Sequence, residues 1–231
     1  MFEGFEGVTS LAEKQLVDQQ IEKSLAIARH IAGSINIGLQ DELWESCPAV
    51  QITHYWSGEL APSSRFAEAR LYWNEEALQV RFVCEQHEPL VISEEPVVDS
   101  KTLGIWDRDV CEIFLAPDKR EPERYFEFEV APTGEWVDLA IAFTPAGRET
   151  EWDYTSGISV ACEVGLNQIV LSMTIPWSGR LPRPERGDEW GTNLFRCIGS
   201  DEGTRYMAWR PTYTPEPNFH VPGAFGVLRF T

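Results

Sequence analysis

The chain has 231 residues, with 37 acidic and 19 basic side chains, a formal net charge of −18 and nine tryptophans. Hydrophobic residues make up 43% and charged residues 24%, which is typical of a globular domain, and no run approaches the ~18 consecutive apolar residues of a membrane span. The acidic excess would repel phosphate groups, and no Lys/Arg cluster offsets it, so we expect neither nucleic acid nor a membrane as a partner.

The N-terminus and the cysteines bear on the compartment. MFEGFEGVTSLAEKQLVDQQ has no basic region followed by an apolar one, so the chain as written is expected to be cytoplasmic; a mis-assigned or trimmed start would make it a secreted protein. The cysteines show no C-x-x-C spacing, and their odd number excludes complete pairing within one chain. We expect reduced core residues at most of Cys47, Cys84, Cys111, Cys162 and Cys197.

Residues 10–32 carry the signals of one amphipathic helix. Ser10 and Glu13 can form a capping box, and Gly33 can end the helix. Apolar residues recur between them at helical spacing, at Val17, Ile21, Leu25, Ala28 and Ala32. We therefore predict an N-terminal helical extension over residues 1–36. It would pack on the main domain, on a partner enzyme or on a second copy of the chain.

From residue 35 onward the hydrophobic period changes to two. ARLYWNEEALQVRFVCEQ predicts a β-hairpin that turns at Asn74-Glu75-Glu76. Strands of similar length are predicted by DVCEIFLAP, RYFEFEVAP, EWVDLAIAF, SGISVACEV, NQIVLSMTIPW, TNLFRCIG, TRYMAWRP and GVLRF. About ten short strands without intervening helices favour an all-β protein, an antiparallel, jelly-roll-like β-sandwich over residues 37–231 preceded by the helix.

Alternation within three of these strands places carboxylates opposite apolar residues. Glu112 lies on the face opposite Cys111, and Glu127 and Glu129 lie opposite Phe128. If the strands are neighbours, one surface would carry Glu112, Glu127 or Glu129, Trp136 and Asp138. Aromatic rings beside carboxylates suit a polyol, because sugar C–H groups can lie on the rings while hydroxyls bond to the acids. An ordinary solvated sheet face is the alternative.

Seven short motifs occur in the order seen in one family. They are DELW with Trp44, ARLYWNEEALQVRF, WDRDVCEIFL, YFEFEVAPTGEWVD, TIPW, WGTNLFR, and WRPT running into NFHVPGAFGVLRF. Over residues 37–231 the chain resembles the family-nine carbohydrate-binding modules. The resemblance implies a non-catalytic β-sandwich that grips a mono- or oligosaccharide, or the end of a glycan, between two tryptophans.

The resemblance also implies site residues. Trp106 matches the first clamping ring, Trp209 is the candidate for the second, and Glu112 matches a carboxylate that bonds to sugar hydroxyls. The family's next strand carries an arginine where this chain has Glu127 and Glu129, which implies a more acidic pocket with Glu129 in it. Arg196 or Arg210 would then supply the positive donor. Asp109 is a further candidate, either for the ligand or for bracing its loop.

Two other classes of protein compete with a binding module. A jelly-roll glycoside hydrolase could use two of Glu112, Glu127, Glu129 and Asp138, although the strands lack a dense repeat of acids. A haem-binding sandwich would need axial ligands, and Met173 and Met207 have no obvious partner histidine. No metal site and no cofactor are predicted. Structural calcium stays open, with no ligands named, because no D-x-D-x-D-G loop occurs.

Overall fold

The computed structural model describes residues 24–33, 35–201 and 203–231, and this part of the chain is all-β. The strands are β1 (Leu25–His30), β2 (Val50–Ile52), β3 (His54–Tyr55), β4 (Ala67–Trp73), β5 (Ala77–Glu85), β6 (Val110–Ala116), β7 (Arg124–Val130), β8 (Trp136–Thr144), β9 (Gly147–Glu151), β10 (Ser159–Val164), β11 (Gln168–Pro176), β12 (Glu189–Cys197), β13 (Tyr206–Ala208) and β14 (Gly226–Phe230). Short 3-10 turns occur at η1 (Glu42–Ser46), η2 (Ser63–Arg65), η3 (Ile105–Asp107) and η4 (Pro222–Ala224). Within the described residues, no helix is long and apolar enough to cross a membrane.

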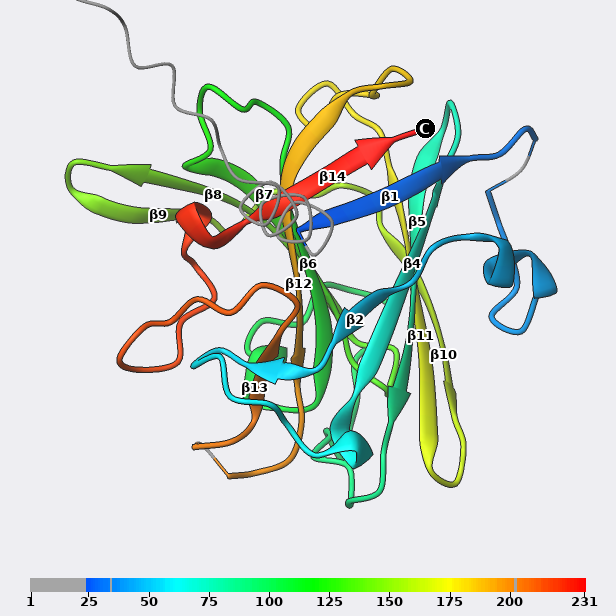
Figure 1. The fold of residues 1–231 in the computed structure, drawn as a ribbon, viewed down its shortest axis with the longest axis vertical. Coiled ribbons are helices and arrows are strands. Elements are labelled where there is room, and N and C mark those ends of the chain that lie inside the picture. Colours follow the sequence, from blue (N-terminus) through cyan, green and yellow to red (C-terminus); the bar gives the residue numbers. More distant parts are fainter. Residues whose placement is uncertain (1–23, 34, 202) are drawn as a thin grey trace, which may run out of the picture.

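The strands form one continuous, strongly curled sheet. Its main order is β10-β11-β5-β4-β1-β14-β12-β6-β7-β8-β9, and β2, β3 and β13 pair beside this path. Figure 1 shows β1 (blue) and β14 (red) side by side. They lie between two groups of strands, which are β10-β11-β5-β4 on one side and β12-β6-β7-β8-β9 on the other. The curl brings the groups together: Cys84 of β5 and Cys111 of β6 are far apart in the strand order, yet their sulfurs are 3.5 Å apart.

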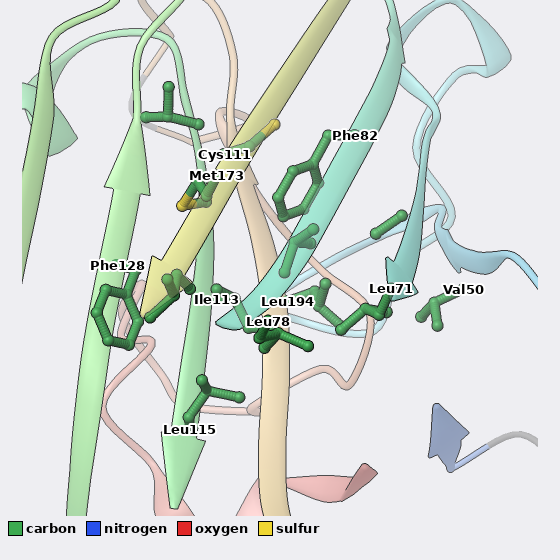
Figure 2. Close-up of a cluster of buried hydrophobic side chains, with 14 of the residues drawn as sticks. Val50, Leu71, Leu78, Phe82, Cys111, Ile113, Leu115, Phe128, Met173 and Leu194 are labelled. Carbon is green, nitrogen blue, oxygen red and sulfur yellow. The ribbon is translucent and has the colours of Figure 1, made fainter. Parts of the chain in front are cut away.

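The concave side of the sheet encloses the main core. Cys111, Ile113 and Leu115 of β6 point into it together with Phe128 of β7 and Phe82 of β5. Figure 2 shows Phe82 and Phe128 on the two sides of this cluster, with Ile113 and Met173 between them. These side chains are fully buried, so their apolar surface is the principal force that holds the two groups of strands together.

A second apolar cluster covers the opposite face of β6, β7, β8 and β12. It contains Phe114, Tyr125, Leu139 and Phe195, and connecting loops that carry Ile105 and Phe219 lie over it. These four strands therefore carry apolar residues on both faces, and the glutamates of β6 and β7 lie within the second cluster. Those glutamates are buried instead of facing water as an ordinary sheet surface would.

The structure confirms the all-β class and corrects two features of the predicted fold. The sheet is mixed and not purely antiparallel, because β1 runs parallel to both β4 and β14. The predicted helix over residues 10–32 is wrong at Leu25–His30, which forms β1; residues 10–23 lie outside the described part of the chain. Alternate residues of β1 are buried by its neighbours, and this tertiary pairing overrides the local helical spacing.

The predicted grouping of acids and aromatics is also corrected. In the β7–β8 register, Asp138 lies opposite Phe128, whereas Glu127 and Glu129 lie opposite Leu139 and Val137. Asp138 and Trp136 are therefore on the concave face, and the glutamates are on the other. Alternation alone could not show this, because both faces of β8 carry apolar residues and neither is marked as the core.

Candidate functional site

A pocket of about 300 Å³ lies against the convex face of β6, β7 and β8, under the loops that cover the second apolar cluster. Its wall is built from widely separated parts of the chain: Trp106, Glu112, Phe114, Glu127, Leu139, Arg148, Thr150, Trp152, Cys197, Tyr206, Pro217, Asn218, Phe219 and His220. The sheet supplies the floor, whereas turns and loops supply most of the rim. A rigid floor with loops around it is the usual construction of a binding site.

Two tryptophans form an aromatic wall on one side of the pocket. Trp106 lies in the η3 turn and Trp152 directly follows β9; their ring centroids are 6.3 Å apart and their planes differ by 39°. A sugar between two parallel rings would need about 3.5 to 4 Å on each side, so the two rings act as one surface and not as a clamp. Trp152 is 47% exposed, and such an exposed large ring is available to a ligand.

The position of Trp152 depends on the buried ion pair of Lys101 and Asp138. The Lys101 ammonium lies 2.8 Å from Asp138 Oδ1 and donates to the carbonyl oxygens of Asp138, Trp152 and Tyr154. Asp138 Oδ2 accepts hydrogen bonds from the amide and hydroxyl of Ser156. The segment that carries Trp152 is thus tied to β8 from the concave side of the sheet.

Three carboxyl groups meet at the floor of the pocket. Glu112, Glu127 and Glu129 are 2%, 4% and 0% exposed, and one oxygen of each lies within 4.8 Å of one oxygen of the others. Glu112 and Glu129 are direct cross-strand neighbours, and Glu127 follows on the same face of β7. Among the described residues, this is the one group of His, Cys, Asp or Glu side chains spaced closely enough to hold a metal ion.

Burial raises the pKa of all three carboxyl groups. For Glu112 and Glu129 the pKa lies well above the ordinary value, first because the charged form is desolvated and second because the neighbouring carboxylates repel one another. The pKa of Glu127 is raised in the same direction, again chiefly by desolvation. The raised pKa favours the protonated form of each group, and a protonated carboxyl group can donate as well as accept hydrogen bonds.

His220 borders the glutamates as a neutral ring. Burial lowers its pKa to about 3, and the Tyr125 hydroxyl lies 2.8 Å from its Nδ1. Glu127 Oε2 is 3.9 Å from the same nitrogen, but a neutral imidazole makes no ion pair there. The imidazole consequently offers polar contacts to a ligand without adding positive charge.

The predicted site residues fall into two groups. Trp106 and Glu112 line the pocket, and Glu129 lies beneath it beside Glu112. Trp209 instead packs against the main core, with its ring so close to Gly226 that an added Cβ would lie 2.6 Å from it. The structure thus places the two tryptophans of the expected clamp against different apolar clusters and does not bring them together.

Asp109 and Arg196 are engaged in buried bonds away from the pocket wall. Asp109 accepts hydrogen bonds from the amides of Gly199 and Val91, which ties two loops together. Arg196 is 1% exposed and donates to the carbonyl oxygens of Arg65 and Phe66 and to the side chain of Gln86. Both side chains brace the framework around the site.

Several pocket residues were not predicted from the sequence. Strand alternation does not indicate Trp152, Arg148 and Tyr206 as ligand contacts, because these residues lie at or near the ends of strands, where alternation carries no information. Trp152 lies in the turn Trp152-Asp153, which resembles any polar loop in sequence. The signal available in the sequence is a tryptophan within a polar loop segment, because a large ring that lies outside the core favours a binding role.

Comparison with known families identifies the class of domain. Residues 37–231 match the family described as carbohydrate family 9 binding domain-like. The chain belongs to this family. The predicted resemblance is therefore confirmed, and the family-9 assignment covers the described sheet from before β2 to the end of β14. A search of curated proteins finds no match.

Solved structures share the fold at low sequence identity. A candidate carbohydrate-binding protein from Bacteroides uniformis is 15% identical, with a TM-score of 0.70 over 90% of this chain and 99% of its own. A family-9 module from Caldicellulosiruptor kristjanssonii in complex with glucose is 16% identical, with a TM-score of 0.63 over 90% of this chain and 95% of that one. Its complex with cellotriose gives 14% identity and a TM-score of 0.61, covering 90% and 93%.

Family-9 domains are non-catalytic binding modules, as predicted. The arrangement of the carboxyl groups is consistent with this assignment. Glu112, Glu127 and Glu129 all rise from one sheet face on adjacent strands, so they approach a ligand from the same side. Glycoside hydrolases place their two carboxyl groups so that they flank the bond that is cleaved.

Proposed function

We propose that this family-9 domain binds a mono- or oligosaccharide in the pocket between the Trp106–Trp152 wall and the glutamate floor. The observation that carries the proposal is the meeting of an aromatic surface and buried carboxyl groups in one open pocket of about 300 Å³. That volume lies at the lower end of the range for small-molecule sites and suits a sugar ring or the end of a glycan.

Each side of the pocket would recognise a different face of the sugar. The C–H groups of a pyranose ring are apolar and can lie on the rings of Trp106 and Trp152, which removes apolar surface from water. The hydroxyl groups can donate to Glu112 and Glu127 in either protonation state, and they can accept a hydrogen bond from whichever carboxyl group is protonated. Few rotamers would be lost on binding, since both glutamates are already fixed by burial.

The remaining predicted residues would act indirectly. Glu129 lies beside Glu112 on the neighbouring strand, and the repulsion between the two helps to raise the pKa of Glu129. Asp109 and Arg196 hold the loops around the pocket. Trp209 supports the main core under β14. We therefore propose Trp152 in place of Trp209 as the second tryptophan that contacts the ligand.

Isothermal titration with glucose and cellotriose tests the proposal. Trp106→Ala is expected to weaken binding about tenfold or more, because aromatic contacts at interfaces contribute more than 1 kcal/mol. Trp152→Ala should act in the same direction. Trp177→Phe, outside the pocket, is the matched control and should leave the affinity unchanged.

Three results would contradict this assignment. If neither sugar nor a wider panel of oligosaccharides binds to the unaltered chain, the proposed function fails. If Trp209→Phe abolishes binding while Trp106→Ala and Trp152→Ala do not, the ligand lies elsewhere on the sheet. Release of reducing sugar from a polysaccharide would show that the glutamates act as a catalytic pair.

A further inference from the structure

The floor of the pocket holds three carboxyl groups, and none of them forms an ion pair with a lysine or arginine among the described residues. Glu127 lines the pocket and is 4% exposed, yet its Oε2 has no hydrogen-bond partner among the described residues. Both oxygens of Glu129 are likewise buried and receive no hydrogen bond from another kind of side chain or from the backbone of the described residues; the Glu127 carboxyl group is their one neighbour that can share a proton with them. Among the described residues, the hydrogen bond to the Glu112 side chain is a long one, 3.7 Å from the Cys197 sulfur to Glu112 Oε1. Unsatisfied buried oxygens of this kind are costly, and a group entering the pocket could satisfy them.

The nearby cations do not supply that group. Among the nearby arginines, Arg205 is buried. Its guanidinium donates to the backbone oxygens of Trp106, Asp107 and Arg108 instead of to a carboxylate. Arg148 of β9 lies at the exposed rim of the pocket. The titratable and charged groups that face or influence the cluster are Cys197 of β12, Tyr125 of β7, Asp107 and Arg205 of the covering loops, Arg148 of β9 and the neutral His220.

We propose that the pocket selects a cationic sugar, an amino sugar whose protonated amine bonds to the carboxyl groups of Glu112 and Glu127. This inference rests on the proposed function, since it assigns a ligand class to the same pocket. An ammonium group has three donors and no acceptor, which complements a cluster of acceptor oxygens without competing donors. Charge-assisted hydrogen bonds of this type are about twice as strong as neutral ones.

The aromatic wall favours the same ligand. A sugar ring on Trp106 and Trp152 would hold its substituents at the edge of that wall, beside the glutamate floor. Tryptophan also attracts a nearby cation through its ring face. A neutral hydroxyl gains neither the charge interaction with the glutamates nor this attraction, so the pocket should distinguish an amine from a hydroxyl on otherwise similar sugars.

The dependence of affinity on pH separates the two kinds of ligand. A protonated amine binds best when the glutamates are ionised, so its affinity should increase as pH rises through their titration, while the amine keeps its proton. A neutral sugar gains nothing from that ionisation and loses carboxyl donors. Its affinity should stay flat or decrease over the same interval.

The experiment compares three sugars by isothermal titration at about pH 6, namely glucosamine, glucose and uncharged N-acetylglucosamine. We expect glucosamine to bind at least tenfold more tightly than glucose, and this preference to grow as the pH is raised within the range where the amine keeps its proton. Glu127→Gln keeps the shape of the side chain and should reduce the preference to less than threefold. Glu163→Gln removes the same charge from the exposed edge strand β10 and should leave the preference intact.

The outcomes distinguish this inference from the function on which it rests. Glucose binding as tightly as glucosamine, with Trp106 required, would overturn the cationic ligand but leave carbohydrate binding standing. No binding of any sugar would overturn both. Titration with Ca²⁺ alone tests whether the glutamates bind a metal ion instead. Ca²⁺ binding that depends on Glu127 and prevents glucosamine from binding would assign the glutamates to a metal and overturn the proposal.

Discussion

Lys101 places its ammonium group where several oxygen atoms converge. Its neighbours are the Asp138 carboxylate and the carbonyl oxygens of Asp138, Trp152 and Tyr154. Carboxylates and backbone carbonyls in such a set are the ligands that calcium uses in proteins. Here a side chain of the chain itself supplies the positive charge. The loop that carries Trp152 is therefore held without a metal at this point.

Lys101→Met should destabilise the fold and weaken ligand binding together. Removing the ammonium leaves the fully buried Asp138 carboxylate without its counter-charge, and breaking a buried pair in this way costs about 3 kcal/mol or more. Urea unfolding and sugar titration measure the two effects. Lys119→Met, in a more exposed pair with Glu189, is the control and should cost about 1 kcal/mol at most. Equal losses in both variants would contradict the structural role of Lys101.

The buried glutamates predict an unusual pH dependence of stability. Their pKa is raised in the folded chain, so the folded state binds more protons than the unfolded state above the ordinary glutamate pKa. The stability that these protonated groups contribute is fully present below about pH 4.3, the ordinary glutamate pKa. As pH rises from there through the pKa of each group in the folded chain, the free energy of unfolding falls by at most about 1.4 kcal/mol per pH unit for each group.

Glu129→Gln tests that dependence because the amide keeps the shape and cannot ionise. The free energy of unfolding of the variant, relative to the unaltered chain, should increase as pH rises from about 4.5 to 8. Chemical unfolding at several pH values measures the difference. Glu163→Gln on exposed β10 serves as the control, with an offset that stays constant with pH. A constant offset for Glu129→Gln as well would show that its carboxyl group ionises normally.

Among the elements, β1 contributes most to closing the sheet. It pairs in parallel with β14 on one side and β4 on the other, and its Ala26 and Ala28 are buried. Without it, β14 and part of β4 would present unpaired edges, and the main order of the sheet would be interrupted between them. The family match begins at residue 37, so β1 lies before the matched region although it is part of the same sheet.

Truncation of the chain tests the importance of β1. A chain that begins at residue 37 should lose about 5 kcal/mol of stability through lost strand pairing, which lowers the midpoint of thermal unfolding by about 10 °C or more. A chain that begins at residue 24 retains the whole strand and is the control. Calorimetry compares the two. Equal midpoints would show that residues 37–231 fold independently of β1, as the predicted domain boundary implies.

The sequence predicted most strands but not their arrangement. Alternation located β6, β7 and β8 correctly because each strand is long enough to show a period of two. It failed at β1, where six residues rich in alanine fit a helical stripe equally well. Alternation also could not show that Glu112 and Trp152 line the same pocket, because strand register and the course of the loop after β9 depend on contacts between distant segments.

At the scale of the whole molecule, one curled sheet has two apolar cores with separate roles. The concave core, which includes Phe82, holds the two groups of strands together. The convex core, which includes Phe114, supports the loops and forms part of the pocket wall. Stability and ligand recognition are therefore assigned to different faces of β6, β7 and β8.

Two phenylalanine variants should separate these roles. Phe82→Ala removes a fully buried ring and should cost about 3 to 5 kcal/mol, while the protein that remains folded binds sugar with unchanged affinity. Phe114→Ala should cost a similar amount and also weaken binding. Urea unfolding and titration at low temperature report the two properties. A loss of affinity in Phe82→Ala equal to that in Phe114→Ala would show that the faces are not independent.

The pairing of β1 with β14 also sets the order in which the domain can form. β1 begins at residue 25 and its partner β14 ends at residue 230, so the contact that joins the two groups of strands connects nearly opposite ends of the described chain. During synthesis, β4, β5 and β6 leave the ribosome long before β14, and their sheet edges and apolar faces stay uncovered until then. Folding dominated by such distant pairings is slow and exposes intermediates to aggregation. Production of this protein in cells should therefore depend on protection of the nascent chain until the segment Gly226–Phe230 has left the ribosome.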